Sequence, residues 1–154
     1  MTRETPHHKI KYWSSIYKEN QFLVFATKKG VVKKTSLAEY SNVRKSGIIA
    51  INIRENDEVV KVILTDNNSE LILTSKLGKA IRFNEKDVNE VGRNSTGVRG
   101  IRLQETDELI GLEIVNPNNT LLTVTEKGFG KRTSLSEYAV IRRGGKGVRN
   151  IKVS

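Results

Sequence analysis

The sequence predicts an all-β fold, a propeller-like array of short four-stranded blades. Three observations lead to this prediction. Glycines recur at a nearly constant spacing, each repeat holds several short β-branched runs, and turn residues bound those runs. A repeat of this kind is typical of propellers and related radial arrays. A chain of 154 residues holds about three such repeats, so we expect a partial array.

Two sets of glycines mark the repeat. The first set is Gly30, Gly78 and Gly128, whose members are 48 and 50 residues apart. The second set is Gly47, Gly97 and Gly147, whose members are 50 residues apart. Four residues past each glycine of the first set stands a cation: Lys34, Arg82 or Arg132. The repeats are therefore placed approximately at residues 21–68, 69–118 and 119–154.

The strands are expected in the same order in each repeat. The first strand, at 22–25, 71–73 and 121–124, leads through a glycine turn into a second, at 31–35, 79–83 and 129–133. A connector at 37–40 and 135–138, interpreted as one helical turn, follows. The third strand starts at the second glycine, and an acidic loop precedes the fourth, at 59–64 and 109–115. We expect the four strands of one repeat to form one blade.

Residues 1–20 show no period and are interpreted as an N-terminal arm or the remnant of a preceding blade. They hold both histidines, His7 and His8, and the only tryptophan, Trp13. Without a third ligand nearby, the histidine pair does not predict a metal site. Trp13 is expected to plug the open end of a core.

The composition favours a polyanionic partner. Lysine and arginine number 27 against 17 acidic residues, which gives a net charge of +10 and a pI near 9.9. Nucleic acid and an acidic membrane surface both fit this charge. The chain has no cysteine and no apolar run long enough to span a bilayer, so we expect a soluble, cytoplasmic protein with no membrane partner.

Catalysis finds little support in the sequence. The only histidines lie in the arm, so a small hydrolase lacks its usual base. The acid pairs Asp57 with Glu58 and Asp107 with Glu108 occupy the same loop of successive repeats, which indicates a structural role in the turn. The run 144–147 is not a nucleotide phosphate loop, because Val148 stands where Ser or Thr is required. We predict no catalytic residue, metal or cofactor.

The basic residues are better explained by binding to a phosphate backbone. The loop before each third strand carries cations beside glycines, whose main chain can approach phosphates closely. The predicted DNA-binding residues are Lys33, Lys34, Arg44, Lys45, Arg82, Arg93, Lys131, Arg132, Arg142, Arg143, Gly144, Gly145, Lys146 and Gly147. The alternatives are an ordinary solvated face and a protein-binding propeller whose basic rim meets an acidic partner.

Residues 21–154 resemble the C-terminal domains of DNA gyrase A subunits and, more distantly, those of topoisomerase IV A subunits. The resemblance is carried by residues 30–35, 92–101 and 128–138. It implies a β-pinwheel, in which propeller-like blades exchange strands and duplex DNA wraps around the basic outer rim to support supercoiling. The partners that it implies are double-stranded DNA, the gyrase B subunit and the rest of the gyrase A subunit, and the location that it implies is the nucleoid in the cytoplasm.

Residues 142–147 match most of the family's basic box, Gln-Arg-Arg-Gly-Gly-Lys-Gly, on which wrapping depends. Ile141 stands where glutamine is usual. The family normally carries this box in its first blade, whereas the motifs around it here resemble middle blades. Two explanations fit this position of the box: a secondary copy of the box on a later blade, or a rearranged array of blades. The family's catalytic tyrosine and ATP site lie in regions not represented here, so the resemblance implies that this segment neither cuts DNA nor hydrolyses ATP.

Overall fold

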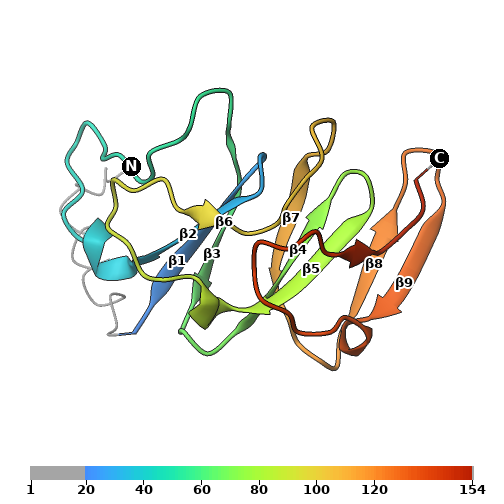
Figure 1. Ribbon diagram of the computed structural model, residues 1–154. Helices are drawn as coiled ribbons and strands as arrows, with labels where there is room; N and C mark the ends of the chain where they lie inside the picture. The colour runs from blue at the N-terminus through green and yellow to red at the C-terminus, as the bar shows by residue number, and fades with distance from the viewer. Residues whose placement is uncertain (1–19, 154) are drawn as a thin grey trace, which may run out of the picture.

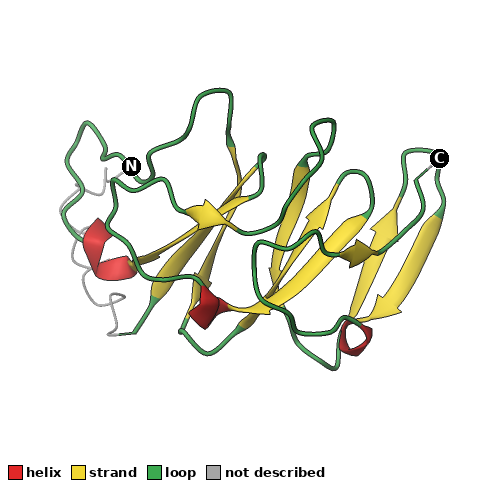
Figure 2. Cartoon of the chain, viewed as in Figure 1, coloured by secondary structure: helices red, strands yellow, loops and turns green. Residues whose placement is uncertain are grey.

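The computed structural model describes residues 20–153 as an all-β array of blades that stand side by side (Figure 1). The described part of the chain holds ten strands and three single turns of 3-10 helix, coloured in Figure 2. All pairings between strands are antiparallel. The expected all-β, propeller-like architecture is confirmed. The arm at 1–19, with His7, His8 and Trp13, lies outside the described residues.

The first blade has the strand order β3-β1-β2-β6. A hairpin of β1 (Phe22–Thr27) and β2 (Val31–Ser36) forms its centre, and β3 (Val59–Thr65) pairs with β1 on one side. The short strand β6 (Val98–Arg99) completes the other side by pairing with β2. Between β2 and β3, η1 (Leu37–Tyr40) forms the single helical turn expected for the connector.

The second blade repeats this order as β7-β4-β5-β10. Its central hairpin is β4 (Glu70–Ser75) with β5 (Lys79–Asn84), and β7 (Leu109–Ile114) lies along β4. β10 (Val148–Arg149) lies along β5, and η2 (Glu85–Asp87) follows β5. The third blade consists of β8 (Thr120–Val124) and β9 (Gly130–Ser134), with η3 (Leu135–Glu137) after it.

The structure corrects the expectation that the four strands of one repeat form one blade. β6 belongs to the second repeat by sequence but pairs with the first blade, where Val98 lies opposite Val32. β10 belongs to the third repeat and pairs with the second blade, where Val148 lies opposite Ala80. The alternation of apolar residues fixes which face of a strand is buried but not which sheet it joins, so the repeat pattern left this open. Strand exchange is what the resemblance to β-pinwheels implied.

The segment after Gly47 forms no strand, contrary to the expectation for the first repeat. Residues 47–54 have no regular secondary structure, whereas the equivalent residues after Gly97 and Gly147 form β6 and β10. Each of those two strands pairs with the repeat that precedes it. A strand needs a partner for its backbone groups, and no described strand of this chain pairs with segment 47–54.

Exchanged strands pass directly over the glycine turns of the first two repeats. Gly30 and Gly78 adopt φ of 81° and 78°, in the left-handed region that glycine favours. A Cβ on Gly30 would lie 2.8 Å from the carbonyl oxygen of Ile101, and a Cβ on Gly78 would lie 2.2 Å from that of Ile151. The carbonyl of Gly30 accepts hydrogen bonds from the amides of Gly100 and Ile101, at 2.8 and 3.3 Å.

The hydrophobic core lies mainly between blades. A cluster from the first two repeats includes Val24, Val32, Leu71, Phe83 and Leu112, all fully buried. A smaller cluster joins the second blade to the third and includes Ile72, Leu135 and Tyr138. Burying one such side chain contributes about 1.5 to 3 kcal/mol, so these two clusters stabilise the junctions between adjacent blades.

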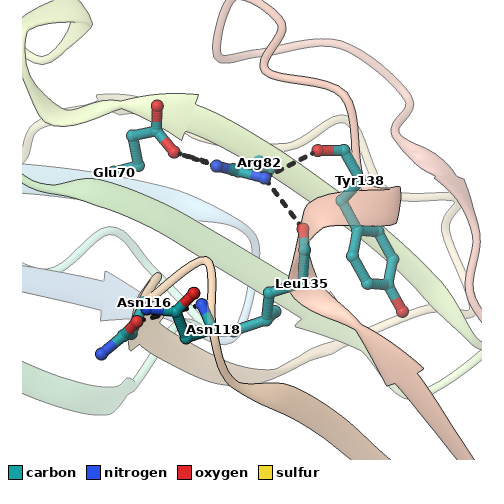
Figure 3. A network of polar contacts seen from close by, with 6 residues as sticks. All are labelled: Glu70, Arg82, Asn116, Asn118, Leu135 and Tyr138. Atoms are coloured by element: carbon teal, nitrogen blue, oxygen red, sulfur yellow. Dashed lines mark hydrogen bonds and ion pairs between the residues drawn. The ribbon is translucent and has the colours of Figure 1, made fainter.

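A buried arginine links the second blade to the third (Figure 3). Arg82 on β5 donates through Nη1 to the carbonyl oxygens of Leu135 and Tyr138, at 2.8 and 3.1 Å. Its Nε and Nη2 donate to the Glu70 carboxylate, which balances the charge. Ile141 and Arg82 continue the link, because the Ile141 amide donates to the Arg82 carbonyl at 2.9 Å.

We expect replacement of Arg82 by methionine to destabilise the chain by about 2 to 4 kcal/mol, because two carbonyl groups and a carboxylate lose their partner at a buried site. Denaturation in urea, followed by circular dichroism, measures this change. Arg132→Met is the matched control: Arg132 occupies the same position in the third repeat but is exposed, so its loss should cost less than about 0.5 kcal/mol. Equal effects of the two substitutions would contradict the assignment of Arg82 as a link between blades.

Candidate nucleic-acid interface

The three glycine loops at 42–47, 92–97 and 142–147 follow one another along one edge of the array. The amide of Asn52, just after the first loop, donates to the carbonyl of Ser95 in the second loop at 3.2 Å. The amide of Arg102, just after the second loop, donates in the same way to Gly145 in the third, at 2.8 Å. Gly144 also donates to the Gly100 carbonyl, at 2.6 Å. Because each loop rests on the segment that follows the preceding loop, their cations are set out in a row.

Six of the predicted DNA-binding cations are exposed. The first loop holds Arg44 and Lys45, and the third loop holds Arg142 and Lys146. The other two, Lys131 and Arg132, lie on β9. The glycines of the third loop, Gly144, Gly145 and Gly147, are half-buried. The second loop contributes Arg93, which is also half-buried. The structure therefore brings the loop cations together along the edge, with β9 at one end of the array.

Arg93 and Arg143 clamp their loops onto the preceding repeat. Arg93 donates from Nη1 to the carbonyl oxygen of Ile49 at 2.6 Å. Arg143, at the equivalent position, donates from Nη1 to the carbonyl oxygen of Arg99 at 3.0 Å and from Nε to that of Asp87 at 2.7 Å. Part of each guanidinium is thus engaged by main-chain carbonyls, and these two arginines position the loops.

Three of the predicted DNA-binding cations are buried. Lys33, Lys34 and Arg82 are 0%, 4% and 8% exposed. Lys33 donates from Nζ to the carbonyls of Ala50, at 2.9 Å, and Arg93. Lys34 donates to Asn67 Oδ1 at 2.8 Å and to the Glu85 carbonyl at 3.1 Å. The structure thus corrects their assignment to the DNA surface. Lys34 and Arg82 share one position in the repeat and link adjacent repeats, and Lys33 also binds the following repeat through the Arg93 carbonyl.

Exposed arginines that the sequence pattern did not single out lie beside the loops. Arg99 on β6 and Arg149 on β10 are both exposed, two residues past the loop glycine of their repeats. Their shared position in the repeat was the signal that could have identified them. On the same side of the array, Lys86 and Arg142 line a shallow hollow of about 520 Å³ between η2 and residues 140–143.

The acid pairs hold the turns, as the sequence predicted. Asp107 is buried and accepts from the amides of Leu77 and Glu108 at 2.8 and 2.9 Å, while its second oxygen accepts from the Ser75 hydroxyl at 2.7 Å. Asp57 accepts from the amides of Lys29 and Glu58, both at 2.9 Å. A carboxylate that caps a hairpin turn in this way is a structural group.

The described residues 20–153 contain no group of three His, Cys, Asp or Glu side chains that could hold a metal ion. Across the same residues, no helix has the length and apolar character needed to cross a membrane.

The fold and this edge define a class of repeat protein: strand-exchanged β-blades whose connecting loops form a basic rim. Comparison with known proteins identifies the family. A family model described as DNA gyrase C-terminal domain, beta-propeller, matches residues 21–66, 69–116 and 119–154. The chain belongs to this family, which confirms the resemblance found in the sequence.

The relatives agree. The DNA gyrase A subunit of Clostridium acetobutylicum is 48% identical over 94 residues, which is 60% of this chain and 11% of that protein. The DNA gyrase A subunit of Haemophilus influenzae is 46% identical over 83 residues, which is 54% of this chain and 9% of that protein. The chain thus spans about a tenth of the length of these relatives.

Two solved structures have the same fold. The crystal structure of the C-terminal domain of DNA topoisomerase IV is 33% identical, with a TM-score of 0.83, over 86% of this chain and 42% of that one. The structure of a DNA gyrase A C-terminal domain is 30% identical, with a TM-score of 0.76, over 86% of this chain and 44% of that one. The chain is thus a domain of the type II topoisomerase family.

Burial of Lys33 generates a prediction about pH. Burial lowers the pKa of Lys33 from its ordinary 10.5 to about 8, and the positive charge of Arg93 adds to the effect. Between these two values the unfolded chain binds more protons at Lys33 than the folded chain does, so the contribution of Lys33 to stability rises with pH. We expect the parent chain to gain stability relative to Lys33→Met from about pH 8 to 10.5. Urea denaturation of both proteins across this interval measures the difference, and a difference that stays constant would contradict the lowered pKa.

Proposed function

We propose that this chain is a duplex DNA-binding and DNA-wrapping module of a type II topoisomerase, acting without sequence preference and supporting supercoiling. The observation that carries the proposal is the row of three glycine loops along one edge, with exposed cations in or beside each loop. A duplex offers a regular row of phosphates, and a row of cations on adjoining blades can follow it.

The proposed contacts are Arg44, Lys45, Lys131, Arg132, Arg142 and Lys146, joined by Arg99 and Arg149 on the exchanged strands. Arg93 and Arg143 position the loops through their bonds to main-chain carbonyls. Gly144, Gly145 and Gly147 let the main chain of the third loop approach phosphate oxygens closely. Lys33, Lys34 and Arg82 are left out of the contact surface because they are buried.

The proposed partners are double-stranded DNA and, in the whole enzyme, the gyrase B subunit together with the rest of the gyrase A subunit. Strand cleavage and ATP hydrolysis are assigned to those other parts, so the chain acts without a cofactor of its own. We place it in the cytoplasm, on the nucleoid. This division follows from membership of the family together with the short share of the relatives that the chain spans.

Affinity for duplex DNA should fall steeply with salt. About 6 to 10 phosphate contacts reduce affinity by a thousandfold or more between 50 and 200 mM salt. Arg142→Ala with Lys146→Ala should weaken binding to unrelated sequences alike and flatten the salt slope by about 0.9 for each phosphate that is no longer neutralised. Fluorescence anisotropy with two duplexes of different sequence measures both effects.

Lys61→Ala is the matched control for charge. Lys61 lies on β3, at the opposite edge of the first blade from β6, and pairs with Glu113. Its loss should leave affinity for DNA within about twofold. A flat salt response, or loss of binding on only one sequence, would contradict binding through the phosphate backbone. Tighter binding to an acidic polypeptide than to DNA would favour a protein partner instead.

Wrapping is tested separately by DNA topology. The chain is bound to relaxed circular DNA, a type I topoisomerase relaxes the remaining strain, and the protein is then removed. Wrapping should shift the distribution of topoisomers in proportion to the amount of protein, whereas simple binding leaves it unchanged. A shift that survives Arg142→Ala with Lys146→Ala would show that the third loop does not guide the DNA.

A further inference from the structure

The hollow between η2 and residues 140–143 spans the junction of the second and third repeats. Its volume is about 520 Å³, and its walls come from both repeats: Lys86 and Asn89 on one side, residues 140–143 on the other. Arg143 joins the two walls, because its Nε donates to the Asp87 carbonyl at 2.7 Å. The hollow is therefore part of the contact between these repeats.

Hydrogen bonds to the main chain fix both walls. The Lys86 amide donates to Asn84 Oδ1 at 2.9 Å, which caps η2. On the other wall, the Ile141 amide donates to the Arg82 carbonyl at 2.9 Å. The cations of the hollow thus stand on a preorganised backbone, which reduces the entropy lost when they bind a ligand.

The cations of the hollow keep free donors. Lys86 Nζ, the Arg142 guanidinium and Arg143 Nη2 have no hydrogen-bond or ion-pair partner among residues 20–153. One carboxylate, that of Asp87, lines the same hollow and leaves an excess of positive charge. Like charges gathered in this way repel one another, and a bound anion relieves the repulsion. Guanidinium and ammonium donors that converge on one space suit a phosphate group.

Two apolar residues line the hollow beside these cations. Val140 and Ile141 are 49% and 40% exposed. Apolar side chains suit the deoxyribose on either side of a phosphodiester, and they displace water from the contacts between cations and phosphate, which strengthens those contacts. The hollow therefore fits a sugar-phosphate backbone.

The junction of the first and second repeats has the same backbone but lacks this charge. The Val91 amide donates to the Lys34 carbonyl at 2.9 Å, the same bond at the same length as in the second junction. The residues that replace Lys86, Val140 and Arg142 there carry no positive charge: Ala38, Glu90 and Gly92. The fold thus forms a junction without these cations, which indicates that the cations of the second junction serve a ligand.

A repeat that follows in the array leaves this side of a junction open. Glu90 and Gly92 are exposed although the third repeat follows them in the chain. Val140 and Arg142 occupy the same positions one repeat later and are exposed in the same way. Access to the hollow is therefore a property of the repeat itself.

We propose that this hollow holds one phosphodiester group of bound duplex DNA, with Lys86 as a contact that the second repeat adds to the basic edge. The phosphate accepts from Lys86 Nζ, the Arg142 guanidinium and Arg143 Nη2. Its two sugars lie against Val140 and Ile141. The duplex is then held more firmly at the second junction than at the first. This inference rests on the proposed function and adds one fixed contact to the path of the DNA.

Lys86→Ala tests the contact in duplex binding. At about 100 mM salt, affinity measured by fluorescence anisotropy should fall about five- to tenfold, and the salt slope should flatten by about 0.9, the value for one phosphate. Lys61→Ala removes the same charge at the opposite edge of the first blade and should change affinity by less than about twofold. Lys86 is exposed, so the urea midpoint of Lys86→Ala should match that of the parent chain.

A double-mutant cycle tests whether Lys86 and Arg142 hold the same phosphate. When two cations share one phosphate, the double variant loses less affinity than the product of the two single losses. We expect Lys86→Ala with Arg142→Ala to fall short of that product by about twofold or more. Lys86→Ala with Lys131→Ala, on β9, should give the full product because the two sites are separate.

Inorganic phosphate distinguishes the DNA backbone from a free anion as the ligand. In an amide NMR titration, we expect phosphate to shift Lys86, Asn89 and Arg142 in the parent chain and not in Lys86→Ala. Equal shifts in the two proteins would overturn the inference. Saturable shifts in a parent chain that binds no DNA would assign the hollow to a free phosphate and would overturn the proposed function.

The DNA measurements separate this inference from the proposed function. A parent chain that binds DNA, with Lys86→Ala within about twofold of it, would overturn the contact and leave the DNA-binding function standing. A full product in the cycle with Arg142→Ala would also overturn it, because the two cations would then hold different phosphates.

Discussion

The structure depends on hydrogen bonds between a turn glycine and the strand that crosses it from the next repeat. The carbonyls of Gly30 and Gly78 each accept two amides, and a side chain on either glycine would collide with the crossing backbone. This contact places β6 on the first blade and β10 on the second. Because the crossing strand comes from the next repeat, the first and second blades are each completed by their neighbour, and the array forms as a series of linked units.

The same exchange sets out the basic edge. The second and third glycine loops each immediately precede an exchanged strand, so the pairing of β6 with β2 and of β10 with β5 carries these loops to successive blades. Arg93 and Arg143 then fasten each loop to carbonyls of the preceding repeat. The exposed cations of the edge, such as Arg142 and Lys146, therefore stand on a framework fixed by main-chain contacts. Such a framework reduces the conformational entropy that the loops lose when they bind a ligand.

Recurring cations serve two different purposes in this chain. Lys34 and Arg82 recur because the 3-10 turn of the following repeat needs a donor for its carbonyls, and burial lowers the pKa of Lys34 as a result. The cations of the glycine loops recur at less regular positions: Val43 stands where the later loops have Arg93 and Arg143. Lys34 and Arg82 thus make structural contacts, whereas the loop cations Arg44, Arg142 and Lys146 lie on the exposed surface.

The sequence by itself determined the repeat, the strands, the glycine turns and the glycine loops with their charge. These features are local: a turn that needs positive φ selects glycine, and a half-buried strand selects alternating apolar residues. Only the tertiary structure decided that β6 and β10 belong to the preceding blade, and that Lys33, Lys34 and Arg82 are buried while Arg142 and Lys146 are exposed. The reason is that strand partnership and the burial of a long cationic side chain depend on contacts between residues about 50 to 70 positions apart, which no local pattern encodes.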